Sequence, residues 1–219
     1  MYFEFGTPRT LRGLNALTPP LLMLKQRYQI AVIDDQPFLK AEALRNHRFQ
    51  VVEIGDIKAI DQVEAYPVVV CDIRGVGSAF GSGLEGAHLI AEIRKAYPDK
   101  FIMSYSGAEF DMSYNESLSK VDIAVPKDAQ TEYWVKVLED GISTVGDPKR
   151  RWTRFRNTLL QRGVEVHDVF RLEQAFIKSL ERRDSSYLQR ERIPDEIKEV
   201  LYAFARVALV QIIESLGSA

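Results

Sequence analysis

Between residues 28 and 145, short apolar runs alternate with segments whose apolar residues recur at helical spacing. The apolar runs predict strands at 28–33, 49–54, 66–71, 101–105 and 122–125. The segments of helical spacing predict helices at 37–46, 57–64, 84–97, 110–118 and 131–142. This pattern is a repeated strand–helix unit, which is typical of α/β proteins.

Five such repeats predict a five-stranded parallel sheet with helices on both of its faces. Right-handed crossovers restrict the strand order, and the flavodoxin-like order 2-1-3-4-5 is expected. In that order strands 1 and 3 are neighbours, and a crevice lies outside their carboxyl ends. Side chains that directly follow these two strands are therefore candidates for a site.

The pattern changes at Gly146-Asp147-Pro148, beyond which the sequence predicts no strand. Helices are predicted there at 152–161, 166–183 and 194–216. Before the first strand, Thr18-Pro19-Pro20 interrupts any period, with one short helix expected at 21–26. The chain thus divides into a lead-in (1–27), an α/β domain (28–145) and a helical segment (149–219).

Charge is unevenly distributed between these parts. The net charge of −2 indicates neither nucleic-acid binding by the whole chain nor acidic disorder. Residues 1–147 hold 15 Lys and Arg against 21 Asp and Glu, whereas residues 148–219 hold 14 against 10. Residues 1–147 are thus acidic and residues 148–219 mildly basic, which suggests that these two parts attract each other.

One cysteine, Cys71, cannot form an internal disulfide, and its apolar surroundings predict a small buried side chain. The first residues lack the pattern of a secretory signal. No run reaches the roughly 18 apolar residues that a membrane helix needs. We therefore expect a cytoplasmic protein that does not associate with membranes.

Acidic residues follow the two strands that we expect to be neighbours. Asp34 and Asp35 come directly after the first strand, and Asp72 comes after the third. Three carboxylates at one crevice repel one another and resist ionisation unless a cation joins them. Mg²⁺ fits this role because it prefers oxygen ligands. Taken alone, the pair Asp34-Asp35 is also typical of a helix cap and its solvated neighbour.

Two further polar side chains end the remaining strands of this sheet. Ser106 follows the fourth strand, and Lys127 follows the fifth. Acids, a hydroxyl and an ammonium group at one edge suit the transfer of a phosphoryl group to a carboxylate. The lysine supplies positive charge, and the hydroxyl can donate a hydrogen bond to the transferred group.

With these motifs, residues 28–145 resemble the receiver domain of two-component response regulators. The resemblance includes Ser106-Gly107 and the helical segment that begins at Gly83-Leu84-Glu85-Gly86. It implies that Asp72 is the phosphoacceptor and that Mg²⁺ is held by Asp35 directly and by Asp34 through water. The backbone carbonyl of Arg74, two positions after the acceptor, is implied as another metal ligand.

The same resemblance implies that Ser106 and Lys127 bind the phosphoryl group. A sensor histidine kinase or a phosphotransfer protein is the implied donor, and output is expected through protein–protein contact. The protein is then not an enzyme in the ordinary sense, because it only gains and loses its own phosphoryl group.

Three features depart from the receiver pattern. Asp128 follows Lys127 where receivers usually have proline, and Pro126 precedes it. Ala124 occupies the position of the usual aromatic switch residue, and Tyr105 is not expected to replace it because neighbours on a strand point to opposite faces. The loop at 73–83 is long and rich in glycine, which suits a lid or a partner-binding loop.

The helical segment begins with a basic and aromatic stretch at 149–156. Such a composition can bind nucleic acid. However, Trp152, Phe155 and Leu159 fall on one helical stripe, which favours docking or dimer packing. The helix at 194–216 is apolar nearly all round, so we expect a homodimer that buries it in a helical bundle.

Two alternatives to a phosphorylated regulator remain open. The first is a receiver-like scaffold that is never phosphorylated and only assembles partners, which the changes at Ala124 and Asp128 favour. The second is a Mg²⁺-dependent phosphatase or nuclease that uses the same acids. Against the second, the sequence offers no separate general base.

Overall fold

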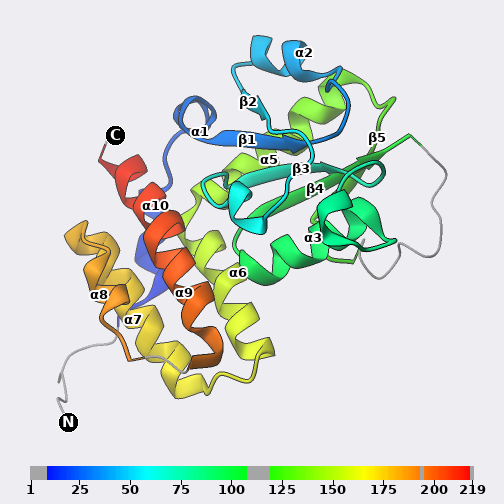
Figure 1. Cartoon of the computed structure of the whole chain (residues 1–219). Coiled ribbons are helices and arrows are strands. Elements are labelled where there is room, and N and C mark those ends of the chain that lie inside the picture. The colour runs from blue at the N-terminus through cyan, green and yellow to red at the C-terminus, as the bar shows by residue number, and fades with distance from the viewer. Residues whose placement is uncertain (1–8, 108–118, 193–194, 218–219) are drawn as a thin grey trace. The chain divides into compact units, whose positions relative to one another are not determined.

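A computed structural model of the chain describes residues 9–107, 119–192 and 195–217 (Figure 1). The chain forms two compact units: one is Pro19–Gly146, and the other joins Asp147–Ala219 to Met1–Thr18. The predicted helix at 110–118 lies outside the described residues, as does the predicted start of the last helix at residue 194.

Five parallel strands form the sheet of the first unit, in the order β2-β1-β3-β4-β5. Their bounds are β1 Gln29–Ile33, β2 Gln50–Glu53, β3 Val68–Asp72, β4 Phe101–Ser106 and β5 Ile123–Pro126. In the register, Ile33 lies beside Cys71, which lies beside Ser104, so β1, β3 and β4 end at one edge. The flavodoxin-like order predicted from the sequence is thus confirmed.

Alternate residues of each strand point to opposite faces of this sheet, and both faces are covered. Val32, Val70 and Met103 pack beneath α1 (Leu21–Arg27), α2 (Ala41–Asn46) and α5 (Thr131–Gly146). Ile33, Cys71 and Ile102 pack beneath α3 (Glu85–Ala96) and the 3-10 turn η2 (Ile60–Val63). Figure 1 shows α3 and α5 on opposite sides of the strands.

Two predicted helices of this unit are shorter than the sequence suggests. The segment 57–64 forms only η2, because the Gln62 side chain accepts hydrogen bonds from the N–H groups of Lys58 and Ala59, at 2.6 and 3.0 Å. The helix predicted at 37–46 begins only at Ala41. Before it, Phe38 donates its backbone N–H to Glu53 Oε2 at 3.1 Å, and its carbonyl accepts from the N–H of Ala41 at 3.0 Å, which closes a turn ahead of the helix.

The second unit consists of helices. They are α6 Pro148–Gln161, α7 Val166–Arg182, α8 Ser186–Gln189, α9 Lys198–Ala203 and α10 Leu209–Leu216. A π-helical segment, Phe204–Ala208, joins α9 to α10, and 3-10 turns occur at Leu11–Leu17 (η1) and Asp195–Ile197 (η5). The sequence pattern did not predict α8 or η1.

Four aromatic rings form the centre of the helical unit. Trp152 stacks on Phe176 with ring centroids 4.6 Å apart, and Phe155 stacks on Phe204 at 4.2 Å. Leu159 is buried in the same cluster, so the predicted stripe on α6 is a core face. The helical unit therefore has a core of its own, so burial of its apolar helices does not by itself require a second copy.

The basic stretch at the start of α6 is tied to this core by polar contacts. Arg151 is 1% exposed and donates to Gln211 Oε1 at 3.0 Å, and Trp152 Nε1 donates to Glu173 Oε2 at 2.9 Å. Arg156 lies 3.6 Å from Glu173. These contacts favour a structural role for the stretch over nucleic-acid binding.

The two halves of the predicted lead-in belong to different units. Leu14 of η1 is part of the helical core, and Arg9 forms an ion pair with Glu181 at 2.8 Å. Leu24 of α1 is instead buried against the sheet, and Lys25 forms an ion pair with Glu139 of α5 at 2.9 Å. The boundary between the units in this region falls between Thr18 and Pro19.

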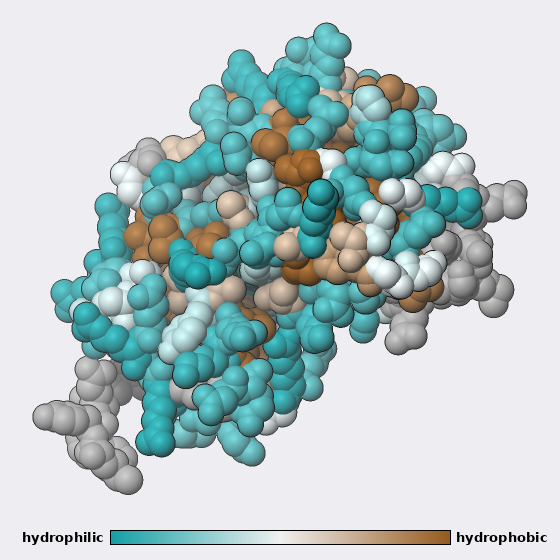
Figure 2. Space-filling model, viewed as in Figure 1, coloured by the Kyte–Doolittle hydropathy of each residue, from teal (hydrophilic) through white to brown (hydrophobic). Residues whose placement is uncertain are grey.

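Hydrophilic residues predominate on the face of the molecule that Figure 2 shows. Among the described helices, none combines the length and the apolar character that crossing a bilayer demands.

The first turn of α6 offers a test of the boundary at Asp147. Its carboxylate caps α6 by accepting from the N–H groups of Lys149 and Arg150, at 2.8 and 3.1 Å. We expect Asp147→Ala to lower the free energy of unfolding by about 1 kcal/mol, as measured in denaturant. Glu165→Ala is the control, because Glu165 precedes α7 without a side-chain cap; an equal loss in both variants contradicts the prediction.

Candidate functional site

Three carboxylates meet at the carboxyl ends of β1 and β3. Asp34 and Asp35 follow the last residue of β1, and Asp72 is the last residue of β3. Each offers an oxygen atom, and these atoms lie within 4.8 Å of one another. Asp34 and Asp72 are only 7% and 3% exposed, whereas Asp35 is exposed. The structure thus brings together the three acids that the sequence singles out.

Asp72 is held from two sides. Lys127 Nζ lies 2.5 Å from Asp72 Oδ2, and the N–H of Arg74 donates to Oδ1 at 3.3 Å. Lys127 reaches this position because it directly follows β5, where its N–H donates to the carbonyl of Ser106 at 3.1 Å. The lysine side chain is 41% exposed, whereas that of Asp72 is 4% exposed.

Asp34 is also fixed by donors. Its Oδ1 accepts from the N–H of Gln36 at 2.9 Å, and its Oδ2 accepts from the hydroxyl of Tyr105. Asp35 makes a weaker contact with the Gln36 side chain, at 3.2 Å. One buried acid with two donors and one exposed acid therefore face Asp72, which suits one firmly held ligand and one that adapts to an ion.

The charges of the cluster favour a cation. Three carboxylates carry three negative charges, and Lys127 is the described cation paired with them. The remaining negative charge lies in a partly buried site where water screens it poorly. Oxygen ligands at this spacing suit Mg²⁺, which also keeps several of its own waters. Asp34, Asp35 and Asp72 therefore fit the ion that the sequence predicts.

The other predicted site residues lie at the same edge of the sheet. Ser106 ends β4 beside Pro126 of β5, and Arg74 lies in the exposed turn after β3. Two roles stay predictions: the Ser106 hydroxyl as a hydrogen-bond donor to the phosphoryl group, and the carbonyl of Arg74 as a metal ligand. Ala124 lies within β5 beside Ser104, and Asp128 is exposed.

Tyr105 belongs to the site, although the sequence did not indicate it. It is 2% exposed, and its ring packs against those of Phe38 and Trp134, with ring centroids 5.4 and 5.5 Å away. Burial, followed by the hydrogen bond to Asp34, raises the pKa of Tyr105 well above its usual range. The hydroxyl therefore stays protonated and donates to Asp34. The one signal in the sequence was a tyrosine at a strand end beside the acids.

Cys71 also lies next to the acids, but its thiol stays protonated and is therefore a poor nucleophile. Burial, with a smaller contribution from the charge of Asp72, raises the pKa of the Cys71 thiol well above its usual range. The neutral thiol is fully buried against α3, so the predicted packing role is confirmed.

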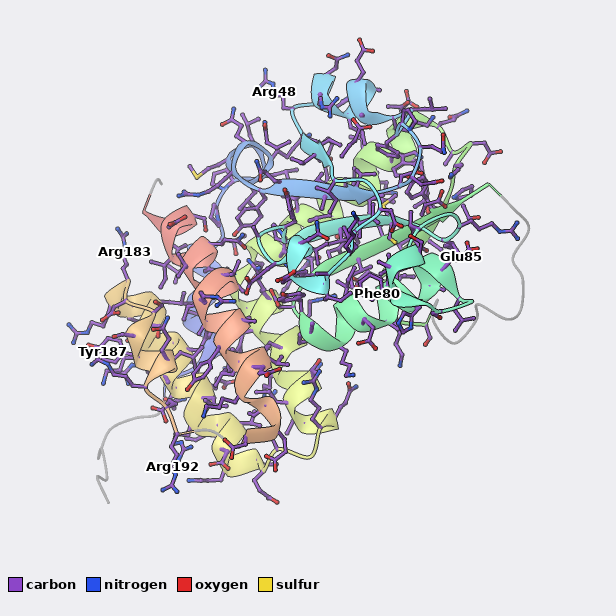
Figure 3. The ribbon with its side chains drawn as sticks, viewed as in Figure 1. Arg48, Phe80, Glu85, Arg183, Tyr187 and Arg192 are labelled. Carbon is purple, nitrogen blue, oxygen red and sulfur yellow. The ribbon has the colours of Figure 1, made fainter. Side chains whose placement is uncertain are left out.

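The glycine-rich loop after β3 is held by two carboxylates. Asp56 accepts from the N–H of Gly77 at 2.6 Å and from the hydroxyl of Ser78 at 2.7 Å. Glu85 accepts from the N–H of Gly75 at 2.9 Å. Figure 3 shows Glu85 and Phe80 near the start of α3, where the loop joins the helix. These contacts fix the backbone of the loop beside Asp35.

Solved structures that this chain resembles include response regulators and their receiver domains. A response regulator from Thermotoga maritima is 21% identical over 53% of this chain and 98% of that one, with a TM-score of 0.43. A CheY-like receiver domain protein from Methanospirillum hungatei is 14% identical over 52% and 93%, with a TM-score of 0.41. Full-length FixJ from B. japonicum is 18% identical over 89% and 99%, with a TM-score of 0.42.

No protein-family model and no curated protein matches the chain. The fold of the sheet unit is therefore identified by its strand order, and the candidate site is identified by the positions of its acidic residues.

Gly75 offers a test of how the loop shapes the acidic cluster. Its φ of +78° is strained for other residues, and an added Cβ would lie 2.7 Å from Asp35 Oδ1. We expect Gly75→Ala to cost about 1 kcal/mol of stability and to weaken Mg²⁺ binding, measured by calorimetry, by at least about fivefold.

Gly81→Ala is the matched control for this variant. Gly81 also has a positive φ, +62°, but an added Cβ there meets nothing within 4 Å. The control shares the backbone cost and leaves Asp35 untouched. Equal Mg²⁺ affinity in the two variants would show that the loop does not shape the site.

Proposed function

We propose that the chain is a response regulator that accepts a phosphoryl group on Asp72 with Mg²⁺. The single observation that carries this proposal is the approach of Lys127 Nζ to within 2.5 Å of Asp72, in the group of three carboxylates. A buried acid beside a partly exposed cation and two further carboxylates is suited to nucleophilic attack on phosphorus. The receiver-like motifs and the similar solved structures agree with this proposal.

The transfer begins with Asp72 as the nucleophile. One carboxylate oxygen of Asp72 forms a bond to phosphorus, and the bond from phosphorus to the donor breaks, with its electron pair leaving on the donor. When bound, Mg²⁺ neutralises charge on the phosphoryl oxygens. Asp34, Asp35, Asp72 and the Arg74 carbonyl would hold it.

Other residues of this chain stabilise the product. Lys127 exchanges its contact with Asp72 for one with a phosphoryl oxygen, and its partly exposed side chain permits that movement. Ser106, at the end of the neighbouring strand, donates its hydroxyl to the same group. Tyr105 and the N–H of Gln36 keep Asp34 oriented throughout. Water later hydrolyses the acyl phosphate and restores the carboxylate of Asp72.

The donor in this proposal is a sensor histidine kinase or a phosphotransfer protein. Output passes through contact with another protein rather than DNA, because the basic stretch of α6 is engaged within the helical unit. The protein turns over no external substrate. A scaffold that is never phosphorylated is the second candidate, favoured by the small Ala124 within β5.

Phosphorylation is tested with a small phosphodonor or beryllofluoride, with and without Mg²⁺. We expect modification of the wild-type chain that depends on the metal and is lost in Asp72→Ala, as measured by mass spectrometry or fluorine NMR. Asp128→Asn is the control, because Asp128 is exposed and adjoins Lys127. No modification together with no Mg²⁺ binding would favour the scaffold, and turnover of an external phosphoester would favour a hydrolase.

Homodimerisation through the C-terminal helices is a separate part of the proposal. Val200 and Ile213 are only partly buried against the helical core, and Tyr202 is 42% exposed, so this surface retains apolar area. Size-exclusion chromatography with light scattering should give twice the 25.0 kDa chain mass. A chain that elutes at the monomer mass at every concentration contradicts the dimer and leaves the phosphorylation test unaffected.

A further inference from the structure

A pocket of about 320 Å³ opens beside the acidic cluster, within the sheet unit. Residues 37–40, which come just before the six-residue α2, form one side of it. The pocket is lined by Asp34, Gln36, residues 37–40, Tyr105, Lys127 and Trp134. This volume is within the range of small-molecule sites.

Three aromatic rings form the apolar part of this pocket. Phe38, Tyr105 and Trp134 meet edge to face, with every pair of ring centroids between 5.3 and 5.5 Å apart. Leu39, at the rim, is 93% exposed. A flat aromatic body is the ligand shape that gains most from such walls, because rings pack edge to face or offset.

The polar groups of the pocket include one cation that lacks an ion-pair partner within the described ranges. The indole N–H of Trp134 also has no acceptor among the described residues, but it is fully buried, so a ligand in the pocket does not reach it. Lys40 has no ion-pair partner in the part of the chain that the structure describes. Asp34, the acid of the lining, already accepts from Tyr105 and Gln36. The available chemistry therefore favours a ligand that carries an anionic acceptor.

We propose that this pocket binds a small aromatic carboxylate. The ring of the ligand packs against Phe38, Tyr105 and Trp134, and its carboxylate pairs with Lys40 at the mouth. This pocket takes a different ligand from the acidic cluster. Asp34 nevertheless belongs to both, and Tyr105 and Lys127 line the pocket while they contact the acids. The inference does not depend on phosphorylation of Asp72.

Phenylacetate serves as the probe, added to the full chain without Mg²⁺ or phosphodonor. We expect saturable binding by calorimetry, with Kd on the order of 1 mM or below. Phenylacetamide, which lacks the charge, and cyclohexylacetate, which lacks the flat ring, should each bind at least about threefold more weakly. Equal binding of all three compounds would overturn the proposed ligand class.

Two variants locate the binding. Lys40→Gln should weaken phenylacetate by about tenfold, whereas Lys58→Gln, which changes an exposed lysine elsewhere in the same unit, should leave it unchanged. Both positions are at the surface, so both variants should fold. If Lys40→Gln binds phenylacetate as the wild type does, or no binding occurs, the proposal is wrong.

The two tryptophans provide an independent reading by NMR. Trp134 lies at the pocket, whereas the indole N–H of Trp152 is bonded to Glu173 in the helical core. Phenylacetate should therefore shift the indole N–H resonance of Trp134 and leave that of Trp152 in place. A shift of neither resonance, or of Trp152 alone, contradicts binding in this pocket.

Discussion

The repulsion among three carboxylates at one edge of a parallel sheet is the constraint on which the rest of the site depends. Asp34, Asp35 and Asp72 are brought together because β1 and β3 are neighbours that end in register. Two of the three are buried, where unpaired charge is costly. The surrounding residues can be understood as the groups that offset this charge: Lys127, the hydroxyl of Tyr105, and the N–H groups of Gln36 and Arg74.

These offsetting groups come from separate parts of the chain, which connects the site to the core. Tyr105 donates to Asp34 while its ring packs in the same cluster as Trp134 and Leu138 of α5. Lys127 lies 5.1 Å above the ring of Tyr105, so it has an aromatic contact as well as an ionic one. Tyr105 thus connects Asp34 and Lys127 to the aromatic cluster behind it.

The helical unit depends on a different interaction, the packing of large aromatic rings. Trp152, Phe155, Phe176 and Phe204 come from three helical elements and stack at its centre. Residues 9–17 complete this core from the other end of the chain, because Leu14 is buried within it. The core of this unit is thus filled by residues of a single chain, so self-association is not needed to form it.

The sequence by itself determined the sheet and the acids. Periodicity located all five strands, and the position of each acid at a strand end was enough to place Asp34, Asp35 and Asp72 together, because carboxyl ends of parallel strands share one edge. Tertiary structure alone decided the role of Tyr105, the late start of α2 and the pocket beside it. Phe38 donates to Glu53 and packs against Trp134, which is far away in sequence, and such long-range contacts leave no local pattern. The tertiary structure also decided what buries α10, because the sequence pattern of an apolar helix is the same whether its own chain or a second copy covers it.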